Sequence, residues 1–251
     1  MSAGLQPVLA PILADAWAMF RRDRDWLGRV AAPFLFFPAF ALALLVPLPP
    51  VLPDGGGGSD TDALAREWAR AATTWAGAYG HWHLLTIAAS SFGAAVLYAA
   101  YLDRDAGDLR GAIGRAFRIL PRFLLAAVLV AIPVQAGLFL WTLPGLYVMG
   151  RTLLTGPALL AERPLGAARA IVRAFALSRG SALALMALAA MPLMLELVLG
   201  QPFAALARQL RSTDGSPVVL ALVAAGSGLA AMLAGLAQVL IAVAAYRRLA
   251  R

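Results

Sequence analysis

The sequence has no cysteine and no lysine, and it has only two histidines among its 251 residues. Without cysteine there is no disulfide, no thiolate nucleophile and no thiolate metal site. Charged residues make up 14% of the chain, against about 25% in an average soluble domain. The sequence contains no glycine-rich phosphate loop, no HExxH pattern and no serine–histidine–aspartate set. Little therefore remains for conventional catalysis, and we expect neither an enzyme nor a bound cofactor.

Apolar residues are what the chain has in excess. They make up 61% of it, and the mean hydropathy is +0.78, whereas soluble domains are about 45–50% apolar. One soluble core cannot take up that excess, so we interpret residues 1–251 as a single all-α transmembrane domain. No short apolar stretch with a small-residue cleavage site precedes the first long apolar run, so we expect no cleaved signal peptide.

Six apolar runs meet or approach the roughly 20 residues that a membrane-crossing helix needs. The third and fourth form one stretch that is too long for a single helix, and we expect it to turn at Pro144 and Gly145. The chain is therefore predicted to be a polytopic bundle of six spanning helices. The expected spans are residues 28–48, 79–102, 123–141, 146–161, 181–199 and 218–246.

The arginines alternate in density from one connection to the next. They crowd the N-terminal segment, the loops after the second and fourth spans, and the C-terminus, while the other connections hold few arginines and more acids. Because cytoplasmic loops are enriched in basic residues, both termini are expected in the cytoplasm. Arginine in place of lysine, with abundant alanine and glycine, is typical of GC-rich bacterial coding, so we expect a bacterial inner-membrane protein. Its cytoplasmic arginines would contact anionic lipid headgroups, not nucleic acid.

A short sequence occurs twice. Residues 112–117 (AIGRAF) match residues 170–175 (AIVRAF), so Arg115 corresponds to Arg173 and Phe117 to Phe175. Both copies lie in amphipathic stretches that precede a span, and such helices lie in the membrane interface. The N-terminal segment followed by the first span fits the same plan loosely. We therefore predict three parallel units, each an interfacial helix followed by a transmembrane hairpin.

Two ionisable residues lie well inside predicted spans, namely Arg151 and Glu196. A central charge costs about 2.5–3.5 kcal/mol on insertion scales, so such residues usually find partners. Both are expected in the outer third of the bilayer, and we predict an ion pair between them that either staples the bundle or forms a binding or proton-relay site. The last span also carries a stripe of small residues that suits close helix packing. The stripe comprises Ala221, Ala224, Gly228, Ala231, Gly235, Gln238 and Ala242.

Residues 137–151 read GLFLWTLPGLYVMGR, a Pro-Gly pair followed by an arginine. Further positions on this pattern are Pro157, Glu162, Ala170, Arg173, Leu177 and Gly180. The pattern resembles the six-helix membrane domain attached to some bacterial glycerophosphodiester phosphodiesterases, and related uncharacterised membrane proteins. The resemblance implies a six-helix domain with Arg151 in its signature, although Ala174 stands where that family has serine. It does not imply phosphodiesterase activity, because the chain has no soluble catalytic domain.

Three classes of function remain from the sequence. We expect first a non-enzymatic scaffold, a membrane-organising protein or a partner of another membrane protein, with a second copy of the chain as a further possible partner. The alternative is a small transporter or lipid-binding protein with a polar site at Arg151 and Glu196. An intramembrane enzyme is the least expected. A polar cavity that reaches the charged pair would favour the alternative, and a tightly packed bundle would favour the first class.

Overall fold

The computed structural model describes residues 6–51, 61–103, 108–162, 164–213 and 215–250, and within them every regular element is a helix. The prediction of an all-α fold is therefore confirmed. The elements are α1 (Gln6–Ala31), the π-helical turn η1 (Ala32–Phe36), α2 (Phe37–Leu45), α3 (Thr61–Leu102), α4 (Leu109–Leu140), α5 (Thr142–Thr152), α6 (Thr155–Ala161), α7 (Ala167–Leu177), α8 (Ala182–Ser212) and α9 (Pro217–Leu249).

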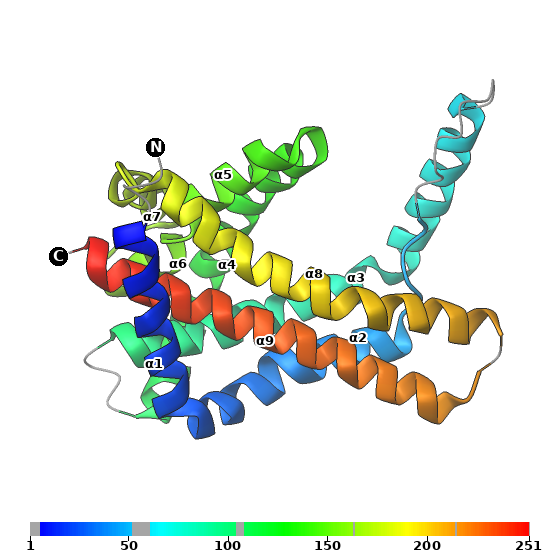
Figure 1. The fold of residues 1–251 in the computed structure, drawn as a ribbon, viewed down its shortest axis with the longest axis horizontal. Coiled ribbons are helices and arrows are strands. Elements are labelled where there is room, and N and C mark those ends of the chain that lie inside the picture. The colour runs from blue at the N-terminus through cyan, green and yellow to red at the C-terminus, as the bar shows by residue number, and fades with distance from the viewer. Residues whose placement is uncertain (1–5, 52–60, 104–107, 163, 214, 251) are drawn as a thin grey trace.

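Five helices of the described chain are long and apolar enough to cross a membrane. One is the continuous run α1–η1–α2, and the others are α3, α4, α8 and α9. Figure 1 shows α2, α8 and α9 running along the length of the molecule, while α1 lies across one end of the bundle. We call that end, where α9 also finishes, the inner end, and we call the opposite end, where α8 turns into α9, the outer end.

The predicted fourth span is not one helix. Residues 146–161 are divided between α5 and α6, and the helix is interrupted at Leu153 and Leu154. Pro157 explains the position of the break, because a proline ring clashes with the carbonyl four residues earlier, here that of Leu153, and cannot donate a hydrogen bond to it. The count of six spanning helices therefore depends on how the α4–α5 pair lies in the membrane.

The turn between the third and fourth predicted spans lies earlier than expected. Trp141 is the single residue in an extended conformation (φ −158°, ψ 127°), while Pro144 and Gly145 lie in the first turn of α5. Proline is tolerated there, and Pro144 excludes helical continuation at Leu140, four residues back. Gly145 packs so closely against Leu138 that a side chain would not fit. The prediction of a turn at Pro144 and Gly145 was therefore wrong by about one helical turn.

Separate interfacial helices were predicted before each hairpin, but only α7 is separate. It ends before Gly180, whose φ of 82° suits glycine and breaks the helix ahead of α8. The other two amphipathic segments continue without a break into the apolar helices that follow, as parts of α1 and α4. Likewise α3 begins at Thr61, well before the predicted second span (residues 79–102).

The hydrophobic core lies at the inner end. Its largest contribution is a run of buried residues at the end of α9 (residues 239–246), which contacts buried residues of α1 and α3. Small residues permit close helix crossings there. A side chain on Gly156 would meet the ring of Tyr98 at 2.7 Å, and one on Gly150 would meet the backbone of Met186 at 2.5 Å. Towards the outer end the helices separate, and this separation forms the candidate site.

Candidate functional site

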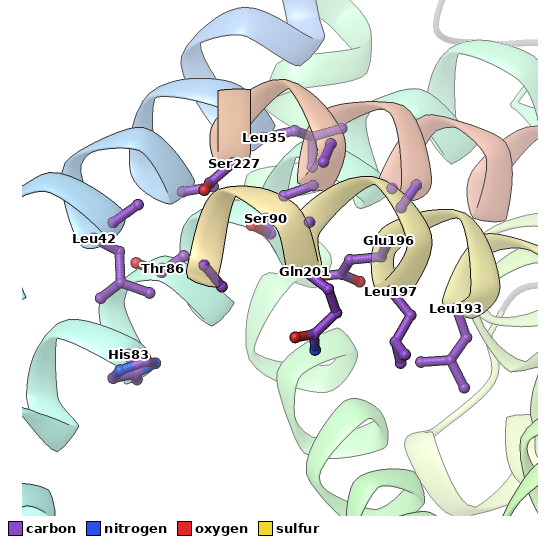
Figure 2. Close-up of a pocket in the computed structure, with 18 of the residues that line it drawn as sticks. Leu35, Leu42, His83, Thr86, Ser90, Leu193, Glu196, Leu197, Gln201 and Ser227 are labelled. Carbon is purple, nitrogen blue, oxygen red and sulfur yellow. The ribbon is translucent and has the colours of Figure 1, made fainter. Parts of the chain in front are cut away.

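A cavity of about 730 Å³ lies between α2, α3, α8 and α9, towards the outer end. We call it the groove. Its walls are mainly apolar, with polar side chains at a few positions. Figure 2 shows Glu196, Gln201 and Leu197 extending from α8 into this region, with Thr86 and Ser90 on α3. The polar residues that line it are His83, Thr86, Ser90, Glu196, Gln201, Ser227 and Gln238.

Glu196 is the acidic residue of the groove. Within the described residues, Glu196 makes no ion pair and no side-chain hydrogen bond. A second polar group is also unsatisfied, because Nε2 of His83 is buried without a hydrogen-bond partner in the described part of the chain. The His83 ring itself lies 5.0 Å from that of Trp75. Buried polar atoms such as Nε2 of His83 are usually hydrogen-bonded, whereas Glu196 is an exposed carboxylate on the groove wall. These two groups are the chemical signal of the groove.

Small residues of α9 form one wall of the groove. Ala224, Ala231, Gly235 and Gln238 line it, and all four belong to the small-residue stripe. Gly228 of the same stripe instead packs against Phe36 and Phe40, with contacts of 3.1 Å for an added Cβ. The stripe therefore packs closely on a neighbouring helix at Gly228 and borders open volume at its groove-lining positions.

The outer end of the groove is held by a segment that we call the outer strap, residues 46–51. Its carbonyls accept hydrogen bonds from the α3 indoles, Trp75 Nε1 to Pro47 at 3.0 Å and Trp68 Nε1 to Pro50 at 3.2 Å. Arg211 of α8 donates to the carbonyls at the end of α2, at 2.7 Å to both Ala43 and Val46 and 3.2 Å to Leu44. These carbonyls are the ones that a helix end leaves without partners, and an arginine commonly binds them.

The predicted ion pair between Arg151 and Glu196 is not formed. Arg151 donates from Nη2 to the carbonyl of Phe175 in α7 at 3.0 Å, and its guanidinium carbon lies 4.9 Å from the centre of the Phe175 ring. Its Nε is buried without a partner in the described residues. Arg151 therefore holds α5 to the amphipathic helix α7.

The distance along α8 explains why the pair fails. Gly150, next to Arg151, crosses α8 at Met186, four residues after the helix begins. Glu196 is ten residues further along, or about 15 Å at roughly 1.5 Å per residue. The prediction assumed that α5 descends from the outer surface, whereas it begins much nearer the inner end.

The arginines of the repeated motif both pair with acids at the ends of preceding helices. Arg115 Nε lies 2.8 Å from Asp103 Oδ2, and Arg173 Nε lies 2.7 Å from Glu162 Oε2. The hydrogen bond to Glu162 raises the pKa of Arg173 above its ordinary value, so this side chain stays charged. Tyr246, near the end of α9, also donates to Glu162 at 2.8 Å.

The aromatic residues of the two motifs lie in different environments. Phe117 is 70% exposed, whereas Phe175 is partly buried and supports Arg151. Ala112 and Ala116 are fully buried on the other side of α4, as Ala170 and Ala174 are in α7. The side of α4 that carries Phe117 therefore faces away from the bundle, as expected for a helix whose apolar face contacts lipid.

These sites were predicted only in part. Glu162 and Arg173 belong to the pattern that carries the family resemblance, but their pairing was not predicted. Arg211 and His83 were not predicted as site residues. Each of these interactions joins residues of different helices, and no spacing within one helix reveals them.

No protein family, curated protein or solved structure matches the chain. The resemblance to the glycerophosphodiester phosphodiesterase membrane domain therefore stays a prediction. Within the described ranges, no three histidine, aspartate or glutamate side chains are grouped as metal ligands.

Proposed function

We propose that this protein is a non-enzymatic, multi-pass membrane protein that holds an amphiphilic molecule, such as a membrane lipid, in the groove. The observation that carries the proposal is an unpaired carboxylate, Glu196, on the wall of a mainly apolar cavity of about 730 Å³. That volume falls within the roughly 300–1,000 Å³ typical of small-molecule sites, which combine apolar walls with a few polar groups.

The chemistry of the walls defines the class of ligand. Apolar tails suit the alanine- and leucine-rich surfaces of α8 and α9, which remove them from water without a polar cost. A headgroup with an amine or several hydroxyls suits Glu196, because an unpaired carboxylate on an apolar wall is stabilised by hydrogen-bond donors or a positive charge. His83 and Gln201 offer further hydrogen bonds to the same headgroup.

The orientation of the chain is part of the proposal. Exposed arginines gather on the helices of the inner end, which supports a cytoplasmic location for that end and contact with anionic headgroups. The start of α1 and the end of α9 would then both lie in the cytoplasm of a bacterial cell, at its inner membrane. The exposed arginines of this end are Arg21, Arg22, Arg24, Arg29, Arg110, Arg118, Arg122, Arg169, Arg179, Arg247 and Arg248.

The three-unit plan also belongs to the proposal, and ion pairs support it. In each amphipathic segment one charged residue pairs with a residue at the end of another helix. Arg115 and Arg173 do so with acids, and Asp15 does so with the charges reversed, through Arg248 at 2.7 Å. Each of the three lies next to a buried alanine (Ala16, Ala116 and Ala174). The N-terminal segment thus follows the same plan as the two matching motifs.

Native mass spectrometry of the purified protein tests the proposal. We expect the wild-type protein to retain a lipid-sized adduct. Ala231→Leu, which fills the groove, should lose the adduct, and Glu196→Gln should retain less of it. Two control variants make the same changes on exposed positions and should keep the adduct, namely Ala205→Leu on α8 and Glu67→Gln on α3.

The outcomes separate the two leading functions. A wild-type protein without any adduct, or an Ala231→Leu variant that keeps it, would overturn lipid binding in the groove. A co-purified polypeptide in the same spectra, without a lipid adduct, would support the scaffold or partner function expected from the sequence.

A further inference from the structure

The turn between α4 and α5 differs from the connections at the outer end in its lack of charge. From Phe123 through Gly150 there is no aspartate, glutamate, arginine or histidine. Charged residues flank the other two connections at the outer end, among them Asp62 and Arg66 in the first turns of α3 and Arg211 near the end of α8. A turn that emerges into water is normally polar, so the α4–α5 turn is unlike an outer loop.

The lengths of the helices also set α4–α5 apart. α5 has 11 residues, about 16 Å, which is roughly half of a hydrocarbon core of about 30 Å. Gly150 crosses α8 at Met186. From there α5 extends eight residues back to Thr142, about 12 Å, whereas α8 extends 26 residues further to Ser212, about 39 Å. Figure 1 shows the tip of the pair well short of the outer end and splayed away from α8.

The tip itself is apolar and unprotected by the rest of the chain. Phe139 is 89% exposed and Trp141 is 76% exposed, and Leu140 and Leu143 are exposed beside them. A contiguous apolar patch of this kind on a surface in water would favour aggregation or binding to a membrane. In hydrocarbon the same side chains are in their preferred solvent.

The backbone of the tip suits a location within the membrane. Non-helical backbone is costly in hydrocarbon because its polar groups lack water. Here Trp141 alone departs from helical geometry, and its N–H still donates to Gly137 O at 2.9 Å. Pro144 has no N–H to satisfy, and Gly137 packs directly on Gly145, with an added Cβ at 2.7 Å from its backbone. The turn therefore keeps one backbone hydrogen bond at the break, and Pro144 removes one N–H group that would need a partner.

We infer that α4–α5 is a re-entrant hairpin, which enters the bilayer from the inner end, turns within the acyl chains and returns to the same side. This arrangement preserves an even number of full crossings and both termini on one side. It also covers the α3–α8 face only near the inner end, where Met149 is the contribution of α5 to the groove wall. The groove is then open sideways to the outer leaflet, and a lipid can enter it directly from there; this last step rests on the proposed function.

The absence of cysteine makes the topology directly testable with single-cysteine variants. Leu143→Cys reports on the tip, Gln209→Cys on the outer end of α8 and Ala168→Cys on α7, all at exposed positions. With a membrane-impermeant maleimide, we expect Gln209→Cys to react from outside the cell and Ala168→Cys only in inverted vesicles. Leu143→Cys should react from neither side, and fully after solubilisation in detergent.

A second measurement gives the depth of the tip. A nitroxide attached to Leu143→Cys in lipid bilayers should be accessible to oxygen and inaccessible to a water-soluble nickel chelate. Labelling of Leu143→Cys from either side, or nickel accessibility equal to that of labelled Gln209→Cys, would overturn the re-entrant hairpin. Circular dichroism and size-exclusion profiles identify variants that fail to fold.

The result is independent of ligand binding. Filling the groove with Ala231→Leu should leave the labelling pattern of Leu143→Cys unchanged. If Leu143→Cys is protected from labelling but no lipid adduct is found, the hairpin stands and the proposed function is rejected. If a lipid adduct is found but Leu143→Cys is labelled, the proposed function stands and the hairpin is rejected.

Discussion

The crossing of α5 and α8 at Gly150 gives a sharp test of the packing that positions the hairpin. An added Cβ at Gly150 would lie 2.5 Å from both the N and the Cα of Met186, and 2.9 Å from the carbonyl carbon of Leu185. These are backbone atoms of a continuous helix, so they cannot rotate away. Gly150→Ala must therefore separate the two helices.

The magnitude follows from a matched substitution. Gly114 also lies inside a helix, but an added Cβ there meets no atom within 4 Å. Gly114→Ala should stabilise the protein by about 0.5–1 kcal/mol, because alanine loses less backbone entropy than glycine on folding. Gly150→Ala gains the same amount but bears an overpacking cost of about 1–3 kcal/mol. The difference between the two variants isolates that cost.

Equilibrium unfolding of the purified variants in detergent, followed by circular dichroism, measures this difference. We expect Gly150→Ala to be less stable than Gly114→Ala by about 1–3 kcal/mol. Equal stabilisation of both variants would refute the α5–α8 crossing, and with it the depth assigned to the hairpin. An unfolding transition that is not two-state would be compared by its midpoint alone.

Two further predictions concern charged side chains and use an exposed arginine of the same helix as the control. Arg211→Ala removes three hydrogen bonds to the end of α2 and should lower the free energy of unfolding by about 1.5–3 kcal/mol. Arg208→Ala should change the free energy of unfolding by less than about 0.5 kcal/mol. Equal effects of the two variants would show that the hydrogen bonds of Arg211 contribute nothing to stability. Arg173→Ala should lower the free energy of unfolding by no more than about 1 kcal/mol, because its side chain is 42% exposed and that of Glu162 is 30% exposed. A loss several times larger than that of Arg169→Ala would contradict this weak pairing.

The apolar runs of the sequence predicted the helices well but not their ends. Run length and hydropathy identified α8 and α9, because a helix in lipid must be apolar along its whole length. The ends depend on tertiary packing and on proline. Pro144 and Pro157 interrupt the helix four residues earlier, while Pro133 and Pro192 lie inside continuous helices. Sequence spacing alone does not distinguish these two behaviours.

The candidate site was predicted in part. Glu196 was selected as an ionisable residue within a predicted span, and it lines the groove. The predicted ion pair with Arg151 was wrong because the depth of Arg151 depends on where α5 begins. Because α5 is short, it begins nearer the inner end than expected. The unpaired Nε2 of His83 has no signature in the sequence, since its isolation depends on the neighbouring helices.

The last helix has a consequence for biosynthesis. Residues 239–246 are buried at the centre of the core, where they contact α1, α3 and the helices between. This segment leaves the ribosome after the helices that it packs against. The earlier helices can insert one after another, but their inner ends have nothing to pack against until α9 has been translated. Contacts between residues so distant in the chain form slowly. A chain truncated within α9 would therefore insert in the membrane and still present an unfinished core to quality-control proteases.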